Sequence, residues 1–357
     1  MDYKAKANQS EIAQAAILQC LRAMESVQQS VLFQAIGEAQ DELKNACAEP
    51  LERAAAALRD STFPESQRDA EIALKQAFSY LRNAIELFSS RSGGADFGAL
   101  FINSRAQQCT ALELLYRWRA DLEVIEPYFR LSADDRTSEQ LGVNAPGLGI
   151  THVPANKKHN DYSLYVPETY DHEQKLPLIV CLHGGYGSGN DYIWSWLRAA
   201  RSRGYVLLSP KSYAQTWSII QPPVDVNSIM AMIDDLVASH NIDRSRIYLS
   251  GLSDGGTFSY LLGLQHADRF CAVAPIAGVL SPATDMMLRA GLAKDLPLHV
   301  VHGVHDMIFP VQSTRSTNKL FESLGYNLTY TELPDWGHAL TYTINEEIVL
   351  PWFEQLS

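Results

Sequence analysis

The segment Gly-Leu-Ser-Asp-Gly-Gly at 251–256 has the residue types that hold an activated serine. It matches the G-x-S-x-G pattern, follows the apolar run IYLS directly and opens a stretch typical of a helix. A nucleophile must stand clear of a sheet on a sharp strand-to-helix turn, and small flanking residues permit that tight backbone. The positive end of the following helix dipole would also lie near the serine. We therefore predict Ser253 as a catalytic nucleophile.

Two later segments offer a base for this serine and an acid that could orient the base. His338 closes the segment DWGH after the predicted last strand, and Asp306 lies in the loop after an earlier strand. An aspartate can hold a histidine ring in the correct tautomer and balance its charge. Each of the three residues follows a predicted strand, and ligands of open α/β sheets lie at that end of the strands. The sequence thus predicts a Ser253–His338–Asp306 triad.

Neighbouring residues could take two of these roles, and both alternatives stay open. His305 adjoins the predicted acid on the same strand end, which is a poor geometry for a partner. Asp335 is a rival acid, although it lies close in sequence to His338. His183 and His302 are interpreted as structural residues that position their loops.

The glycine-rich stretch LHGGYGSGND at 182–191 begins at the end of the predicted strand LIVCL. Such a loop lets a backbone approach a ligand closely, and in hydrolases it supplies one N–H group of an oxyanion hole. The predicted donors are Gly185, with Tyr186 as the alternative, and Asp254, which follows the nucleophile. A phosphate-binding loop is disfavoured because no Walker lysine follows and no G-x-G-x-x-G pattern fits.

Composition restricts the partners of the chain. The formal net charge of −12 over 357 residues is spread along the sequence, which argues against a nucleic-acid partner. No apolar run is long enough for a membrane span, and the N-terminal residues lack the apolar core of a secretory signal, so a cytoplasmic location is expected. The five cysteines are widely spaced without a CxxC or Cys/His pairing. We therefore expect reduced thiols, no metal site and no cofactor.

The chain changes character near residue 130. Residues 1–126 hold only two of the 16 prolines and four of the 21 glycines. Because helices tolerate neither residue well in their interiors, 1–130 are predicted to form a bundle of about three to five helices. Apolar spacings of three and four indicate helices from Ile17 to Ala35, from about 64 to 88 and from about 97 to 128. Residues 131–150 are polar and rich in turn formers, which predicts a linker.

Residues 151–357 alternate short apolar runs with helical stretches. Continuous Val/Ile/Leu runs indicate strands that are buried on both faces, and hence a mostly parallel sheet flanked by helices. The predicted strands are Tyr162–Val166, Leu178–Leu182, Tyr205–Leu208, Ile247–Ser250, Ala272–Ile276, His299–Val301 and Leu328–Leu333, and the predicted helices are Val226–His240, Gly256–His266 and Ser313–Leu324.

Residues from about 160 to 355 resemble the phospholipase/carboxylesterase branch of the α/β-hydrolase superfamily, and also polyhydroxybutyrate-depolymerase-like and feruloyl-esterase-like proteins. YSLYVPETYDHEQKLPLIVCLHGG is similar to the family's entrance and oxyanion strands, IDRSRIYLSGLSDGG to its nucleophile region, HGVHDMIFPV to its acid loop and WGH to its histidine. The order Ser253, Asp306, His338 is also that of the superfamily. The helical first 130 residues have no counterpart in it.

This resemblance implies an α/β-hydrolase fold and cofactor-free cleavage of a small carboxylic ester, with a short acyl chain or an aryl group, through an acyl-enzyme. Four apolar residues on the predicted catalytic side could line the substrate site, because aromatic walls suit an acyl or aryl group. They are Trp194, Trp217, Ile308 and Phe309.

Other functions remain open. A peptidase or thioesterase of the same fold would use the same residues, although peptidases of the prolyl-oligopeptidase type usually carry a β-propeller rather than helices. A non-catalytic scaffold whose helical domain binds a partner is a third reading, and an intact triad argues against it. The helical domain could also join subunits into a homo-oligomer.

Overall fold

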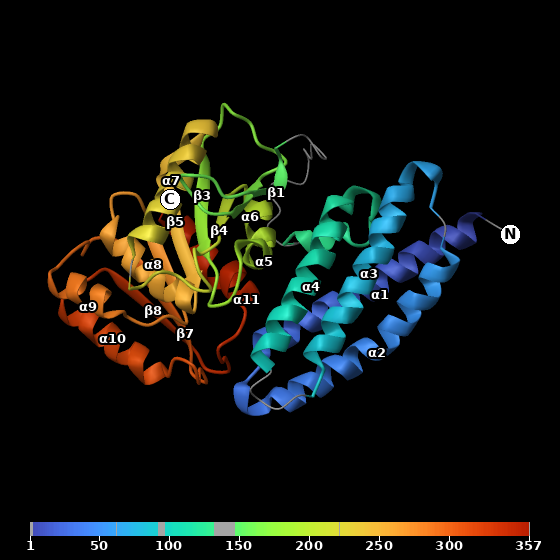
Figure 1. Cartoon of the computed structure of the whole chain (residues 1–357), viewed down its shortest axis with the longest axis horizontal. Helices are drawn as coiled ribbons and strands as arrows, with labels where there is room; N and C mark the ends of the chain where they lie inside the picture. The colour runs from blue at the N-terminus through green and yellow to red at the C-terminus, as the bar shows by residue number, and fades with distance from the viewer. Residues whose placement is uncertain (1–2, 62, 92–96, 132–146, 221, 357) are drawn as a thin grey trace. The chain divides into compact units, whose positions relative to one another are not determined.

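The computed structural model describes residues 3–61, 63–91, 97–131, 147–220 and 222–356 (Figure 1). The chain divides into two compact units, Met1–Ala133 and Asp134–Ser357. Most of the predicted linker, residues 132–146, lies outside the described residues.

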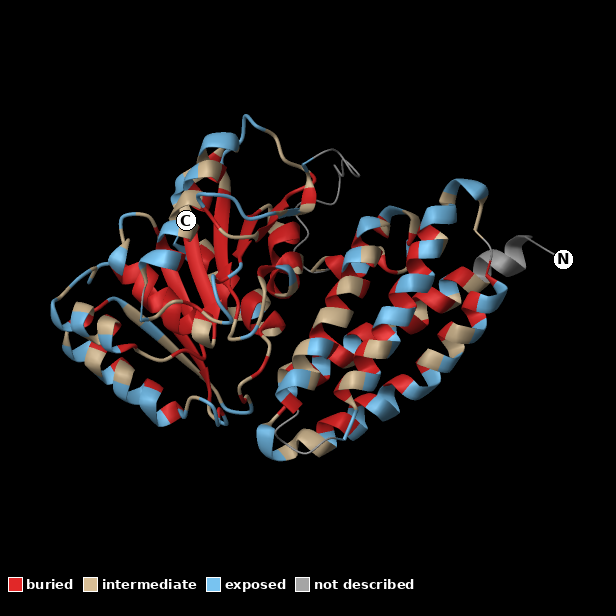
Figure 2. Ribbon diagram, in the orientation of Figure 1, coloured by how far each residue is buried: buried red, intermediate tan, exposed pale blue. Residues whose placement is uncertain are grey.

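The first unit is helical. Its helices pack in pairs, α1 against α2 and α3 against α4, and each presents a buried stripe to the others (Figure 2). In α3 the buried residues Ala70, Leu74, Phe78, Leu81, Ile85 and Phe88 recur at spacings of three and four, which places them on one face of the helix. In the described residues its α-helices are α1 (Tyr3–Ser30), α2 (Ile36–Asp60), α3 (Arg68–Phe88) and α4 (Phe97–Arg117).

Two helix boundaries in this unit differ from the prediction. The stripe from Ile17 to Ala35 crosses the end of α1 at Ser30, and α2, which the apolar spacing did not separate, begins at Ile36. The helix expected to reach residue 128 ends at Arg117 and continues as short 3-10 turns, the last of which contains Pro127. Proline lacks the backbone N–H that donates within an α-helix, so Pro127 disfavours an α-helix at this position, although α2 accommodates Pro50.

The described part of the second unit is built on a sheet of eight strands in the order β1-β2-β4-β3-β5-β6-β7-β8. β2 pairs antiparallel with β1 and β4, and all other pairs are parallel, which confirms the predicted sheet class. The strands are β1 (Gly149–Val153), β2 (Tyr162–Val166), β3 (Leu176–Leu182), β4 (Val206–Pro210), β5 (Ile242–Leu252), β6 (Ala272–Ile276), β7 (Leu298–Gly303) and β8 (Leu328–Leu333).

Strand β1 was not predicted, and its first residues fall within the expected linker. It is a half-exposed edge strand of sequence GITHV and lacks a continuous apolar run. Pairing with β2 is what makes it a strand.

Helices cover both faces of this sheet (Figure 1). Leu178 and Val180 of β3 share one apolar core with α7 (Pro223–Ser239), α8 (Asp254–Gln265) and α10 (Val311–Ser323). The opposite face of the sheet packs on the C-terminal helix α12 (Leu350–Gln355), where Phe353 stacks on Tyr248 of β5 with ring centroids 4.5 Å apart. The shorter helices are α5 (Gly189–Tyr192), α6 (Leu197–Arg203), α9 (Pro282–Arg289) and α11 (Tyr342–Ile344).

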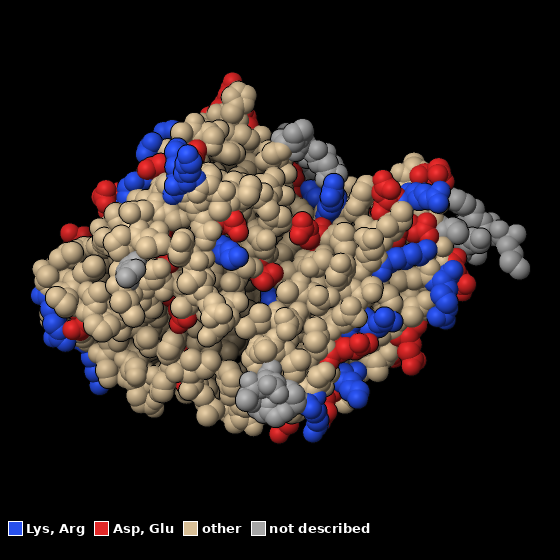
Figure 3. Space-filling model, in the orientation of Figure 1, with Lys and Arg blue, Asp and Glu red and all other residues tan. Residues whose placement is uncertain are grey.

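Two features of the structure concern the predicted partners: the hydropathy of the helices and the distribution of surface charge. No helix in the described part of the chain is long and apolar enough to cross a membrane. On the face shown in Figure 3, acidic and basic side chains are interspersed among uncharged ones.

Candidate active site

Ser253 occupies the turn between β5 and α8, with φ of 58° and ψ of −120°. This left-handed backbone is strained for a residue with a side chain, and a hydrogen bond from the Ser253 N–H to the Ile276 carbonyl (2.9 Å) helps to hold it. A Cβ on Gly251 would lie 2.3 Å from the Gly255 carbonyl oxygen, and one on Gly255 would lie 2.3 Å from that of Leu182. The flanking glycines are therefore required by close backbone approach.

The structure brings the three predicted triad residues together. Nε2 of His338 lies 2.8 Å from Oγ of Ser253, and Nδ1 lies 2.8 Å from Oδ2 of Asp306. With the ring neutral, Nδ1–H donates to the carboxylate and Nε2 accepts the serine hydroxyl proton. The Asp306 side chain is fully buried and the His338 side chain is 11% exposed. This arrangement can move a proton from the hydroxyl to the ring.

Asp306 is held as an ionised carboxylate. Burial acts to raise its pKa, but the His338 hydrogen bond and charge, with the Phe309 N–H, keep the pKa below its usual value. Its Oδ1 accepts the backbone N–H groups of Ile308 (2.9 Å) and Phe309 (2.8 Å). A carboxylate fixed in this way can orient a histidine and stabilise its charged form.

His302 packs behind this carboxylate. Its Nε2 is 2.7 Å from the Phe309 carbonyl oxygen and 3.3 Å from Oδ2 of Asp306, and its Nδ1 is 3.1 Å from Oγ1 of Thr314. Burial lowers the pKa of His302, which favours the neutral ring. A neutral ring that donates Nε2–H to the Phe309 carbonyl fixes the acid loop, in agreement with the structural role expected for this residue.

The rival residues do not take part in this arrangement. Asp335 is exposed, and among the described residues the carboxylate bonded to the His338 ring is that of Asp306. His305 is also exposed, and its backbone N–H donates to the Trp336 carbonyl. Adjacency to Asp306 in sequence places His305 on the outer side of the loop.

The glycine loop after β3 lies against the serine, since a Cβ on Gly184 would be 3.4 Å from Ser253 Cβ. Asp254 is the first residue of α8. The first backbone N–H groups of a helix have no acceptor within the helix, so the N–H of Asp254 is a candidate donor. The N–H of Tyr186 donates to the Gln215 carbonyl at 2.6 Å. The structure therefore contradicts the prediction of Tyr186 as an alternative oxyanion donor. Gly185 and Asp254 remain as the candidate oxyanion donors.

Two of the four predicted substrate contacts are core residues instead. Trp194 and Trp217 are both buried, and the Trp217 ring stacks on Phe258 of α8 while its Nε1–H donates to the His183 carbonyl at 2.7 Å. Burying the large apolar area of a tryptophan ring stabilises the fold, which favours an inward orientation. Neither is positioned as a surface contact for substrate.

The other two lie beside the triad. Phe309 meets the His338 ring edge-on with centroids 5.5 Å apart, and Ile308 is exposed next to it. One neighbour was missed by sequence reasoning: Thr216, whose hydroxyl donates to Oδ2 of Asp254 at 2.5 Å. No motif marks this threonine.

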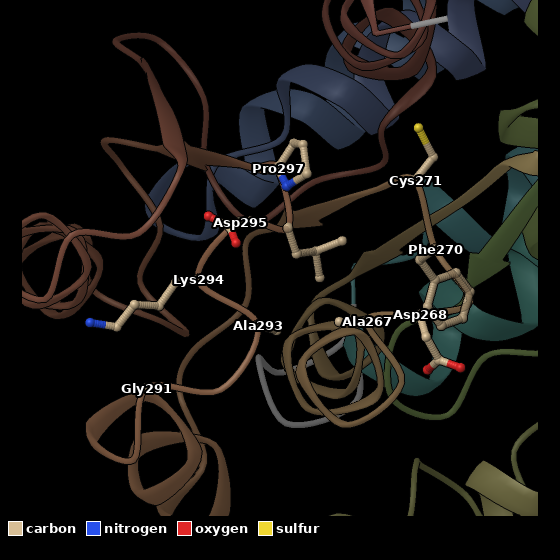
Figure 4. Close-up of a pocket in the computed structure, with 10 residues that line it drawn as sticks. Ala267, Asp268, Phe270, Cys271, Gly291, Ala293, Lys294, Asp295 and Pro297 are labelled. Atoms are coloured by element: carbon tan, nitrogen blue, oxygen red, sulfur yellow. The ribbon is translucent and has the colours of Figure 1, made fainter.

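A separate cavity of about 730 Å³ lies near the starts of β6 and β7, lined by residues that include Asp268, Cys271 and Lys294 (Figure 4). It is at the amino-terminal edge of the parallel strands, opposite the triad, and none of the predicted site residues lines it. Burial raises the pKa of the Cys271 thiol, which makes it a poor nucleophile. No group of three or more His, Cys, Asp or Glu side chains in the described residues could hold a metal ion.

Comparison with known proteins supports the resemblance seen in the sequence. Residues 220–349 match the phospholipase/carboxylesterase family, a span that includes Ser253, Asp306 and His338. A bifunctional acetylxylan esterase/xylanase, XynS20E of Neocallimastix patriciarum, is 30% identical over 159 residues, covering 43% of this chain and 22% of that protein. Feruloyl esterase C of Emericella nidulans is 26% identical over 181 residues, covering 48% and 65%.

Among solved structures, the ferulic acid esterase AmCE1/Fae1A of Anaeromyces mucronatus is 16% identical with a TM-score of 0.49, covering 61% of this chain and 95% of that one. The chain thus spans only 22% of the bifunctional relative and about two thirds of the feruloyl esterase. The predicted resemblance and fold class are confirmed: the second unit has an α/β-hydrolase fold and resembles phospholipases and carboxylesterases, and these relatives are named as esterases.

Proposed function

We propose, from this family match and from the geometry of the site, that the chain is a serine hydrolase of carboxylic esters. Ser253 is the nucleophile, His338 the general base and Asp306 the orienting acid. The observation that supports this most directly is the pair of 2.8 Å hydrogen bonds that connect Ser253, His338 and Asp306 in sequence. This hydrogen-bonded arrangement needs residues from three separate loops, and a fold retained only for structure has no need of it.

In the proposed reaction, His338 Nε2 takes the Ser253 hydroxyl proton as Oγ attacks the ester carbonyl carbon. The carbonyl oxygen becomes an oxyanion, which accepts hydrogen bonds from the backbone N–H groups of Gly185 and Asp254. Collapse of this intermediate expels the alcohol, which leaves with the proton from His338, and the acyl group stays on Ser253. Water activated by the same ring then releases the acid and restores the serine. Asp306 balances the charge of the ring in both steps.

The substrate prediction is for short acyl chains of about two to eight carbons, because each connection after β3, β4, β6 and β7 in the described residues carries only short helices or one helix and no inserted lid. We expect kcat/KM on a p-nitrophenyl butyrate to exceed that on the palmitate at least about tenfold, since a long chain finds no apolar cover. A series from acetate to palmitate measures this. A palmitate preference would contradict it.

An acyl-CoA thioester and a dipeptide amide belong in the same assay, because a thioesterase or peptidase would share the site geometry. Faster turnover of either one than of every oxygen ester would replace the proposed ester substrate, while leaving the nucleophile assignment in place.

We further propose that residues 1–130 are a domain that folds on its own and supports a homo-oligomer. The unit has its own aromatic core, in which Phe88 lies 5.7 Å from Phe97 and 6.1 Å from Phe101, measured between ring centroids. The proposed hydrolase domain, 151–357, is large enough to fold without it.

Removing residues 1–140 should therefore leave a folded fragment whose Ser253 still reacts, with kcat/KM on an acetate ester within about threefold of the full chain. The subunit count measured by light scattering, or the rate ratio between a bulky aryl ester and acetate, should change. An insoluble fragment would show that the two halves share one core. An unchanged subunit count together with an unchanged rate ratio would reduce the bundle to a stabilising appendage. The cytoplasmic location and the lack of a nucleic-acid partner stay predictions.

A further inference from the structure

The loop after β4, residues 211–219, is fixed beside the candidate active site. The carboxylate of Asp225, which is only 1% exposed, accepts the backbone N–H groups of Tyr213 (2.8 Å) and Ser218 (2.7 Å). Trp217 is bonded to the His183 carbonyl, and the Gln215 carbonyl accepts the N–H of Tyr186. A loop tied at so many points holds its side chains in defined positions.

This loop presents Thr216 to Asp254, the residue after the nucleophile. The threonine hydroxyl donates to Oδ2 of Asp254 at 2.5 Å. The same oxygen lies over Gly185, because a Cβ on that glycine would be 2.6 Å from it. The side chain of Asp254 is thus placed beside one candidate oxyanion donor while its own N–H is the other.

The second oxygen of this carboxylate, Oδ1, can accept further hydrogen bonds. An ionised carboxylate offers about four acceptor sites, and in the described residues Oδ1 of Asp254 receives no hydrogen bond. Asp254 is half-buried and stands at the first turn of α8, where the helix dipole favours a negative charge. An acceptor of this kind next to Ser253 is available to a donor on the substrate.

We propose that Asp254 is a specificity-determining residue of this site, which receives a hydrogen bond from an ammonium or hydroxyl group a few bonds from the scissile carbonyl. The inference rests on the proposed ester hydrolysis and names its substrate class: esters whose acyl part carries such a donor. An ammonium is preferred over a hydroxyl, since hydrogen bonds between charged partners are the stronger ones. An anionic acyl group is disfavoured by repulsion from the same carboxylate.

The test uses four p-nitrophenyl esters of nearly equal size, made from β-alanine, 3-hydroxypropanoic acid, butanoic acid and succinic acid. They place an ammonium, a hydroxyl, a methyl and a carboxylate at the same position. After division by the bimolecular rate constant of each ester with hydroxide, kcat/KM should fall in that order, with about a hundredfold between ammonium and carboxylate. Equal corrected rates on the ammonium and methyl esters would overturn the proposal.

Variants then assign the effect to the side chain. Asp254→Asn should lower the ammonium-to-carboxylate ratio about tenfold or more, because the amide keeps the shape but loses the charge. Asp268→Asn is the matched control, since it removes the same charge from an exposed residue at the opposite edge of the sheet and should leave the ratio unchanged. A ratio that Asp254→Asn leaves unchanged would contradict the proposed role.

Thr216 provides an independent arm if the Asp254 variant folds poorly. Thr216→Val removes the hydroxyl that holds the carboxylate and should lower the ratio about threefold, whereas Thr216→Ser keeps the hydroxyl and the wild-type ratio. Equal ratios in the two variants would also count against the proposal. If the wild-type chain hydrolyses none of the four esters, it is the proposed ester hydrolysis that fails.

Discussion

Replacing Ser253 by alanine should abolish ester hydrolysis while the protein stays folded. Loss of the nucleophile in a serine hydrolase costs about 10⁶ in kcat, because the ring and the remaining groups have no hydroxyl to activate. Steady-state rates on the butyrate ester measure the loss, and a fluorophosphonate probe, which reacts only with an activated serine, should label the wild type and not the variant.

Ser250→Ala is the matched control for this variant. Ser250 lies three residues earlier on β5, and its buried hydroxyl donates to the Ala274 carbonyl at 2.8 Å, away from the ring of His338. Its loss should cost about 1 kcal/mol of folding free energy and leave labelling in place. A folded Ser253→Ala protein with activity within about tenfold of wild type would remove the serine from its proposed role.

The choice of acid is tested by Asp306→Asn and Asp335→Asn. The first should lower kcat by about 10⁴, because an amide in place of the carboxylate favours the wrong tautomer of His338 and no longer balances its charge. The second should stay within about threefold of wild type, since Asp335 is exposed and the ring of His338 is bonded to Asp306 instead.

His338→Ala should lower kcat as severely as Ser253→Ala does. Its loss is the reference against which the two aspartate variants are compared. Probe labelling separates misfolding from lost chemistry, because Asp306→Asn should still react slowly with the fluorophosphonate while an unfolded protein does not react at all. A larger loss for Asp335→Asn than for Asp306→Asn would reverse the assignment.

Local pattern was enough to predict most of the sheet. β2, β6 and β8 begin and end at the predicted residues. β2 and β6 are buried, mostly apolar segments, whereas β8 is a partly exposed edge strand of mixed apolar and polar residues. The edge strand β1 was missed, since its formation depends on pairing with β2 rather than on its own residues. The boundary between α1 and α2 was missed for a related reason: apolar spacing continues across a turn whose position the packing of the bundle decides.

The order of the motifs also determined where the chemistry would lie. Ser253, Asp306 and His338 each follow a strand, and parallel strands bring their carboxyl ends to one edge, so their meeting could be expected from the sequence. The glycines around Ser253 have the same origin, because the turn between strand and helix is a local structure that only small residues permit.

Tertiary structure alone decided the remaining contacts. Trp217 could have faced substrate or core, and its stacking on Phe258 settled the matter. The Tyr186 N–H was lost as an oxyanion donor to a carbonyl in another loop, and Thr216 reached Asp254 across 38 positions of sequence. Such contacts depend on how two loops from different strands fold over each other. Sequence spacing does not encode the distance between two such loops, because that distance is fixed by the packing of the whole sheet and its helices.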